Sequence, residues 1–296
     1  MSTRAQALGL LAAGLALPAC SNHRDAVAIG SKNFTEALLL GELYAQLIED
    51  NGHPVRRRLD LGGTDIAMAA IRRGEIDVYP EYTGTALLVV LKAQQQGDAV
   101  QTFDFVKSEY ERLYGLTWLD PAPMNNTQAL ATTAELSAHF GLHTLSDVAA
   151  KAPQLRLGAV PEFVKRSDGL PGLQRVYGGY NFKSIRLIDF GLKYKALLDG
   201  DVDIVVAFGT DGEIVADKLV VMQDDKHLFP PYQVAPVIRQ DALKARPELA
   251  EILNRAAPLL TDTVMRTLNN EISGPKKREP AEVAQDFIKA HGLIST

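Results

Sequence analysis

The chain has 296 residues, of which 46% are hydrophobic and 23% are charged, an ordinary globular composition with room for two lobes. A mild net charge of -5 argues against a nucleic-acid partner, which a basic face would attract. The single cysteine excludes an intrachain disulfide.

The first twenty residues are typical of an export signal. Arg4 stands in a short polar start and is followed by the apolar run LGLLAAGLALPA, which is too short for a membrane-spanning helix of ~20 residues. Residues 17–20 resemble the lipobox of bacterial lipoproteins, which predicts loss of residues 1–19 and lipid attachment at Cys20. The alternative is an ordinary signal peptide with a chance cysteine. We expect a periplasmic protein that contacts the membrane through its lipid anchor only.

Residues 26–79 predict alternating strands and helices. Strands are expected at 26–30, 55–61 and 76–79, and helices after Asn33 and from Thr64. Asn33 and Glu36 have the spacing of a capping box. The turns SKNFTE, GGTDIA and EYTGTA should emerge at one edge of a parallel sheet. The Gly-Gly-Thr turn lacks the dinucleotide-binding spacing, but its N–H groups can hold a carboxylate.

The stretch EIDVYPEYTGT, residues 75–85, has the composition of a ligand site. Pro80 lacks an N–H and is expected to end the preceding strand. Tyr82 and Thr85 lie three residues apart at the start of a helix, so both should point the same way. Open α/β sheets bind ligands at the carboxyl ends of their strands. The alternative is a tyrosine-rich turn that closes over a core.

The rest of the chain predicts a second α/β unit inserted into the first. The proline-bounded segment 119–126 and the segment 229–232 are the expected crossings. Lobe I is therefore predicted to comprise 26–121 plus 230–296, and lobe II 122–229. Further strands are expected at 128–132, 155–160, 185–190, 202–208 and 234–238, and helices at 86–91, 104–114, 145–152, 161–166, 193–198 and within 241–289.

No pattern predicts catalysis, a cofactor or a metal site. Among six scattered histidines, only His139 and His143 share a helical spacing, and no nearby glutamate completes a zinc motif. No serine lies in a G-x-S-x-G elbow. We therefore expect a protein that is not an enzyme.

Aromatic residues instead suggest a binding cleft. Tyr82, Phe208 and Tyr232 each end a strand or lie on a crossing, although singly each is more often a core residue. Together they could form a box of π-faces for a methylated ammonium group. Lys32, Arg166 and the turn before Thr64 could bind a carboxylate on the same ligand.

Several motifs resemble the substrate-binding proteins of quaternary-amine ABC importers, which take up glycine betaine, choline and related osmoprotectants. They are SKNFTE, LGGTDIA, EIDVYPEYTGTA, NNTQAL, PEFVKRSDG, AFGTDGEI, DDKHLFPPYQVAPVIR and LTDTVMRTLNNEI. The resemblance covers residues 26–293. It implies a class II periplasmic-binding-protein fold, a two-lobed α/β architecture with the ligand cleft between the lobes, and an ABC permease as partner. It also implies a monomer. The ligand-binding residues it implies, together with the candidates named above, are Lys32, Asn33, Thr64, Tyr82, Thr85, Asn126, Gln128, Arg166, Phe208, Thr210 and Tyr232.

The chain departs from this family at one wall of the cage. Many members carry an aspartate and a tyrosine where this chain has Asn126 and Gln128. Losing one aromatic face should weaken trimethylammonium binding about tenfold. We therefore expect a quaternary-ammonium binder, with another zwitterion or an amino-acid-like betaine as the alternative ligand.

Overall fold

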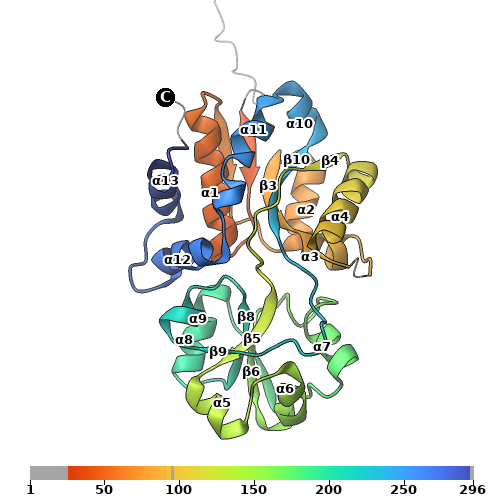
Figure 1. Ribbon diagram of the computed structural model, residues 1–296, viewed down its shortest axis with the longest axis vertical. Helices are drawn as coiled ribbons and strands as arrows, with labels where there is room; N and C mark the ends of the chain where they lie inside the picture. Colours follow the sequence, from red (N-terminus) through yellow and green to blue (C-terminus); the bar gives the residue numbers. More distant parts are fainter. Residues whose placement is uncertain (1–25, 95–96, 294–296) are drawn as a thin grey trace, which may run out of the picture.

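The computed structural model describes residues 26–94 and 97–293 as two α/β bodies joined by two chain segments (Figure 1). The expected signal peptide and Cys20 lie outside these residues. Within the described ranges, no helix combines the length and apolar character needed to cross a bilayer.

The first sheet has the strand order β2-β1-β3-β10-β4. β1, β2 and β3 run parallel, which confirms that the three predicted strand-to-helix turns leave one edge of the sheet, whereas β10 is antiparallel to both β3 and β4. The strands are β1 (Val27–Gly30), β2 (Val55–Arg58), β3 (Val78–Tyr82), β4 (Leu116–Trp118) and β10 (Val234–Arg239). The helical elements around this sheet are α1 (Thr35–Asp50), α2 (Thr64–Arg72), α3 (Thr83–Thr85), η1 (Ala86–Val90), α4 (Ala99–Tyr114), α10 (Gln240–Ala245), α11 (Glu248–Asn254), η4 (Ala257–Leu259), α12 (Asp262–Ser273) and α13 (Pro280–Ala290).

The second sheet has the order β7-β6-β8-β5-β9, with β5 antiparallel to β8 and β9. Its strands are β5 (Gln128–Thr132), β6 (Arg156–Ala159), β7 (Ser184–Leu187), β8 (Ile204–Phe208) and β9 (Val220–Val221). Around it lie α5 (Ala134–Phe140), α6 (Leu145–Lys151), η2 (Ala152–Gln154), α7 (Leu170–Tyr177), η3 (Phe190–Leu192), α8 (Lys193–Leu198) and α9 (Glu213–Ala216). The chain passes between the sheets from β4 to β5 and again from β9 to β10.

Pro80 does not end its strand, contrary to the sequence-based expectation. β3 continues to Tyr82, and Pro80 pairs with Pro236 of β10. Antiparallel ladders alternate between hydrogen-bonded and non-hydrogen-bonded residue pairs. Because neither proline has an N–H, two facing prolines fit only at a non-hydrogen-bonded pair. The strand therefore carries Tyr82 to the mouth of the cleft.

Two other local predictions are wrong. Helix α1 is capped at Phe34 without a side-chain hydrogen bond, so Asn33 and Glu36 form no capping box. Glu36 instead turns inward to buried donors. Residues 161–166 form successive turns rather than a short helix, with the N–H groups of Phe163 and Lys165 bonded three residues back.

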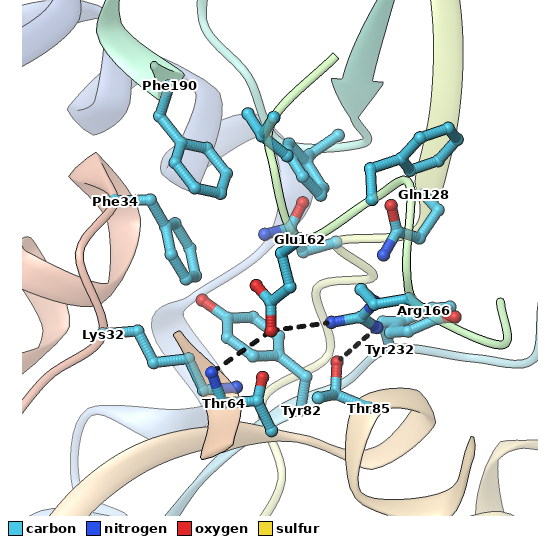
Figure 2. Close-up of a pocket in the computed structure, with 14 residues that line it drawn as sticks. Lys32, Phe34, Thr64, Tyr82, Thr85, Gln128, Glu162, Arg166, Phe190 and Tyr232 are labelled. Carbon is cyan, nitrogen blue, oxygen red and sulfur yellow. Dashed lines mark hydrogen bonds and ion pairs between the residues drawn. The ribbon is translucent and has the colours of Figure 1, made fainter. Parts of the chain in front are cut away.

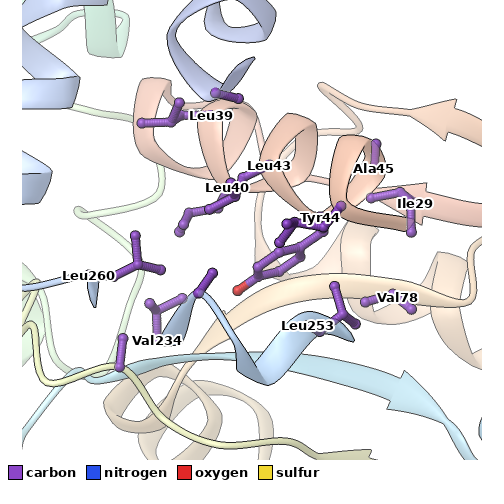
Figure 3. Close-up of a cluster of buried hydrophobic side chains, with 14 of the residues drawn as sticks. Ile29, Leu39, Leu40, Leu43, Tyr44, Ala45, Val78, Val234, Leu253 and Leu260 are labelled. Carbon is purple, nitrogen blue, oxygen red and sulfur yellow. The ribbon is translucent and has the colours of Figure 1, made fainter. Parts of the chain in front are cut away.

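Apolar clusters cover both faces of the first sheet because side chains alternate along its strands. Val78 packs in the cluster that includes α1, and the adjacent Tyr79 packs in the cluster that includes α4. Figure 3 shows α1 contributing Leu40, Leu43 and Tyr44 to the first of these clusters. This packing fixes the start of α1, which borders the cleft.

We predict that Leu40→Ala lowers the free energy of unfolding by about 2–5 kcal/mol, because Leu40 is fully buried and its removal leaves a cavity. Urea unfolding measures the loss. The matched control is Leu113→Ala on α4, where Leu113 is 47% exposed and the expected change is within ~0.5 kcal/mol. Equal losses in the two variants would contradict this account of the core.

Candidate functional site

A cavity lies between the two sheets and receives side chains from both lobes (Figure 2). Its floor comes from the ends of β1 and β3 and the start of α2, and its other side comes from the turn after β6 and the end of β8. The lining residues are Lys32, Phe34, Thr64, Tyr82, Thr85, Asn126, Gln128, Val160, Glu162, Phe163, Arg166, Phe190, Phe208 and Tyr232.

All the sequence-derived candidates except Asn33 and Thr210 line this cavity. Asn33 lines a neighbouring surface pocket. Thr210 is buried and donates to Glu36 at 2.5 Å. Contact of the lining candidates with a ligand stays a prediction.

Four aromatic rings form one wall of the cavity. The ring of Phe34 lies 5.9 Å from that of Tyr82, 5.5 Å from that of Phe190 and 6.5 Å from that of Phe208, measured between centroids. The sequence reading did not include Phe34 or Phe190 in the site. Phe34 carried a usable signal, because it follows a strand at the sheet edge where ligands bind.

Tyr232 lies on the opposite side, beside Arg166 (Figure 2). Its ring packs on Gly84, where an added Cβ would stand 2.6 Å from a ring carbon. Its hydroxyl donates to Asp168 Oδ2 at 2.5 Å. Burial, and then the Asp168 carboxylate, raises the pKa of Tyr232, which keeps the phenol neutral.

Both cations of the site already have buried carboxylate partners. Lys32 Nζ lies 2.5 Å from Glu81 Oε1, and the side chains are 4% and 0% exposed. Arg166 donates to both oxygens of Asp168, at 2.8 and 2.6 Å. Burial lowers the pKa of Arg166, but Asp168 outweighs it and the pKa is raised, so the guanidinium stays charged.

Gln128 is a polar partner of Arg166. With its amide oxygen facing the guanidinium, it accepts from Nε at 3.3 Å and from Nη2 at 3.2 Å. Arg166 Nη2 also donates to Thr85 Oγ1 at 3.2 Å, which links the two lobes. Gln128 therefore helps to hold the arginine at the polar side of the cavity.

Glu162 also reaches into the cavity, and the sequence reading gave it no role. Its Oε1 accepts from the backbone N–H of Thr64, at the start of α2, at 3.2 Å. The same oxygen lies 4.0 Å from Arg166 Nη1. A carboxylate of the protein thus stands at a helix N-terminus, which favours negative charge.

Behind the ring wall, the buried carboxylate of Glu36 joins residues from both lobes. Its Oε1 accepts from the Tyr82 hydroxyl and from Asn126 Nδ2, both at 2.8 Å. Its Oε2 accepts from Thr210 Oγ1 at 2.5 Å and from Asn269 Nδ2 at 2.9 Å. Burial raises the pKa of Glu36 above its ordinary value of 4.5, although the hydrogen bonds from Thr210, Asn269 and Tyr82 oppose this rise.

The arrangement suits binding rather than catalysis. The buried carboxylates at the cleft are engaged by cations or hydrogen-bond donors. No group of three or more His, Cys, Asp or Glu side chains in the described ranges could hold a metal ion. Two α/β lobes with an aromatic and polar cavity between them define a two-lobed solute-binding protein, which confirms the expected fold class.

The chain belongs to the family described as the substrate-binding domain of ABC-type glycine betaine transport systems, whose model matches residues 25–290. Members of this family are substrate-binding components of transporters, not enzymes.

Curated relatives agree with this assignment. A glycine-betaine-binding protein of Pseudomonas aeruginosa is 35% identical, and the alignment covers 97% of this chain and 92% of the relative. An ergothioneine transport permease and binding protein of Helicobacter pylori is 33% identical over 96% of this chain, which spans about half (51%) of that protein.

Solved structures share the fold. The crystal structure of a glycine betaine/carnitine/choline ABC transporter protein is similar with a TM-score of 0.73 and 30% identity, covering 91% of this chain and 100% of that one. Apo YehZ from Escherichia coli is similar with a TM-score of 0.67 and 31% identity, covering 90% of this chain and 99% of that one.

Glu36 makes stability depend on pH. Because its pKa is raised in the folded chain, the native state binds more protons than the unfolded state, and the free energy of unfolding falls as pH rises from about 4.5 through the raised pKa. Glu36→Gln keeps the shape but cannot titrate. We expect the stability advantage of the wild type over this variant to shrink as pH rises in that window, measured by urea unfolding. An advantage that grows with pH would show that hydrogen bonding outweighs burial and lowers the pKa of Glu36 instead.

Proposed function

We propose that this protein captures a quaternary ammonium compound of the glycine betaine, choline or carnitine type and delivers it to an ABC permease as a monomer. The wall formed by Phe34, Tyr82, Phe190 and Phe208 carries the proposal. A methylated ammonium cannot donate hydrogen bonds, and aromatic faces are its usual receptor. The names of the relatives support the same ligand class.

A second candidate ligand is a different zwitterion, such as an amino-acid-like betaine. Gln128 supports it, because this amide offers hydrogen bonds and no π-face at the position where the family resemblance implies a cage tyrosine. The Helicobacter pylori relative is named for ergothioneine, a betaine of this kind. The aromatic wall would bind its trimethylammonium group in the same way.

In the proposed binding cycle, the two lobes close on the bound ligand. We propose that residues 26–121 with 230–296 move as one body and residues 122–229 as the other. The two crossings run side by side, because Asn126 N donates to Tyr232 O at 3.1 Å and Tyr232 N donates to Asn125 Oδ1 at 2.8 Å. Adjacent crossings of this kind suit a hinge.

Removing one ring of the wall should weaken the ligand. Phe34→Leu keeps apolar volume but loses the π-face, and we expect choline and glycine betaine to bind about 5–30-fold more weakly by calorimetry. The neutral analogue 3,3-dimethyl-1-butanol should respond much less, because it carries no charge.

The control for this prediction is Phe182→Leu, since Phe182 is a partly buried ring packed in the core of the second lobe. Its ligand affinity should equal that of the wild type. Equal losses for choline and its neutral analogue in Phe34→Leu would show that the wall acts through apolar contact alone.

The proposed lipid anchor is tested separately. If residues 1–19 are a lipoprotein signal, Cys20→Ser should abolish incorporation of labelled palmitate and release the exported protein into the soluble periplasmic fraction. Ligand affinity should not change, because the residues that line the cavity begin at Lys32. Continued membrane association of the unlabelled variant would contradict the anchor.

A further inference from the structure

The charges that line the cleft are not balanced. Lys32 is paired with Glu81, and Arg166 is bonded through both oxygens of Asp168. Glu162 adds a further carboxylate, 32% exposed, that points into the same cavity. The charged side chains lining this cavity, taken with their buried partners, therefore leave one negative charge.

That extra carboxylate occupies the place suited to a ligand's carboxylate. Thr64 at the start of α2 donates its N–H to Glu162, and Arg166 approaches from the other side (Figure 2). The preceding Gly63 permits this approach, because a Cβ there would lie 3.2 Å from the Glu162 carboxylate. The helix N-terminus and the arginine form an anion subsite that the protein fills itself.

We propose that Glu162 is a specificity-determining residue that fills this anion subsite, so that the cavity prefers quaternary ammonium cations without a carboxylate, such as choline, over zwitterions such as glycine betaine. The inference rests on the proposed function and deepens it. A zwitterion must displace Glu162 from Thr64 and Arg166 or place its own carboxylate beside it, where like charges repel. A cation without a carboxylate leaves Glu162 in place and is attracted by the net negative charge of the lining.

The distances favour Glu162 as the movable group. Asp168 is fully buried, accepts from Nε and Nη2 of Arg166 and also accepts from the Tyr232 hydroxyl. Glu162 has one backbone donor at 3.2 Å and an arginine nitrogen at 4.0 Å. Displacing it therefore breaks fewer contacts, and replacing it leaves the pair of Arg166 and Asp168 intact.

The test compares choline and glycine betaine in wild type and Glu162→Gln, by calorimetry at one ionic strength. The wild type should bind choline more tightly. In Glu162→Gln, choline should weaken and glycine betaine should not, so that the ratio of their affinities falls roughly tenfold or more. Glu162→Asp keeps the charge and should keep choline as the preferred ligand.

Glu135→Gln is the matched control, because it removes the same charge from an exposed residue of α5, at the far end of the second lobe (Figure 1). Its affinity ratio should equal that of the wild type. Thermal melts establish that each variant is folded.

Two results would overturn the inference while leaving the proposed function in place. One is an unchanged affinity ratio in Glu162→Gln, and the other is a wild type that binds glycine betaine at least as tightly as choline. Binding of no quaternary ammonium ligand by the wild type would overturn the proposed function, and this inference with it.

Discussion

The buried carboxylate of Glu36 ties the two lobes together where they meet. It accepts hydrogen bonds from Tyr82 at the end of β3, from Asn126 on a crossing, from Thr210 after β8 and from Asn269 on α12. An unpaired carboxylate here would carry a large desolvation penalty, so the donors must stay in place. Glu36 thereby connects Tyr82, one ring of the aromatic wall, with Thr210 of the second lobe.

The cleft combines two buried ion pairs with a wall of aromatic rings. Lys32 Nζ lies 5.5 Å from the centroid of the Tyr82 ring in that wall, and Arg166 lies across the cavity beside Tyr232 (Figure 2). Buried pairs contribute little net stability because desolvation offsets their attraction, but they fix where Lys32 and Arg166 stand. The cations are therefore shielded before a ligand arrives, and the rings supply the surface for a methylated head group. This division of roles suits a receptor that hands its solute to a transporter, which agrees with the family of the chain.

The sequence by itself determined the local framework of the site. Strand-to-helix turns are encoded by neighbouring residues, so β1, β2 and β3 were predicted with the turns that follow them. The same local signals placed Tyr82 and Thr85 after a strand, where a helix begins, and Thr64 at the start of another helix, and all three line the cavity. Crossings rich in proline likewise marked where the chain leaves one sheet for the other, because proline restricts the backbone whatever surrounds it.

Only the tertiary structure decided which groups meet across the chain. Pro80 stays within a strand because Pro236 faces it, a pairing between residues far apart in sequence. Glu36 has the spacing of a helix cap, yet four distant donors draw it inward. Phe190 and Glu162 enter the cavity because the second lobe faces the first. Such contacts depend on how the two sheets are placed relative to each other, and no local sequence pattern encodes that placement. The placement then determines which side chains form hydrogen bonds and ion pairs across the cleft.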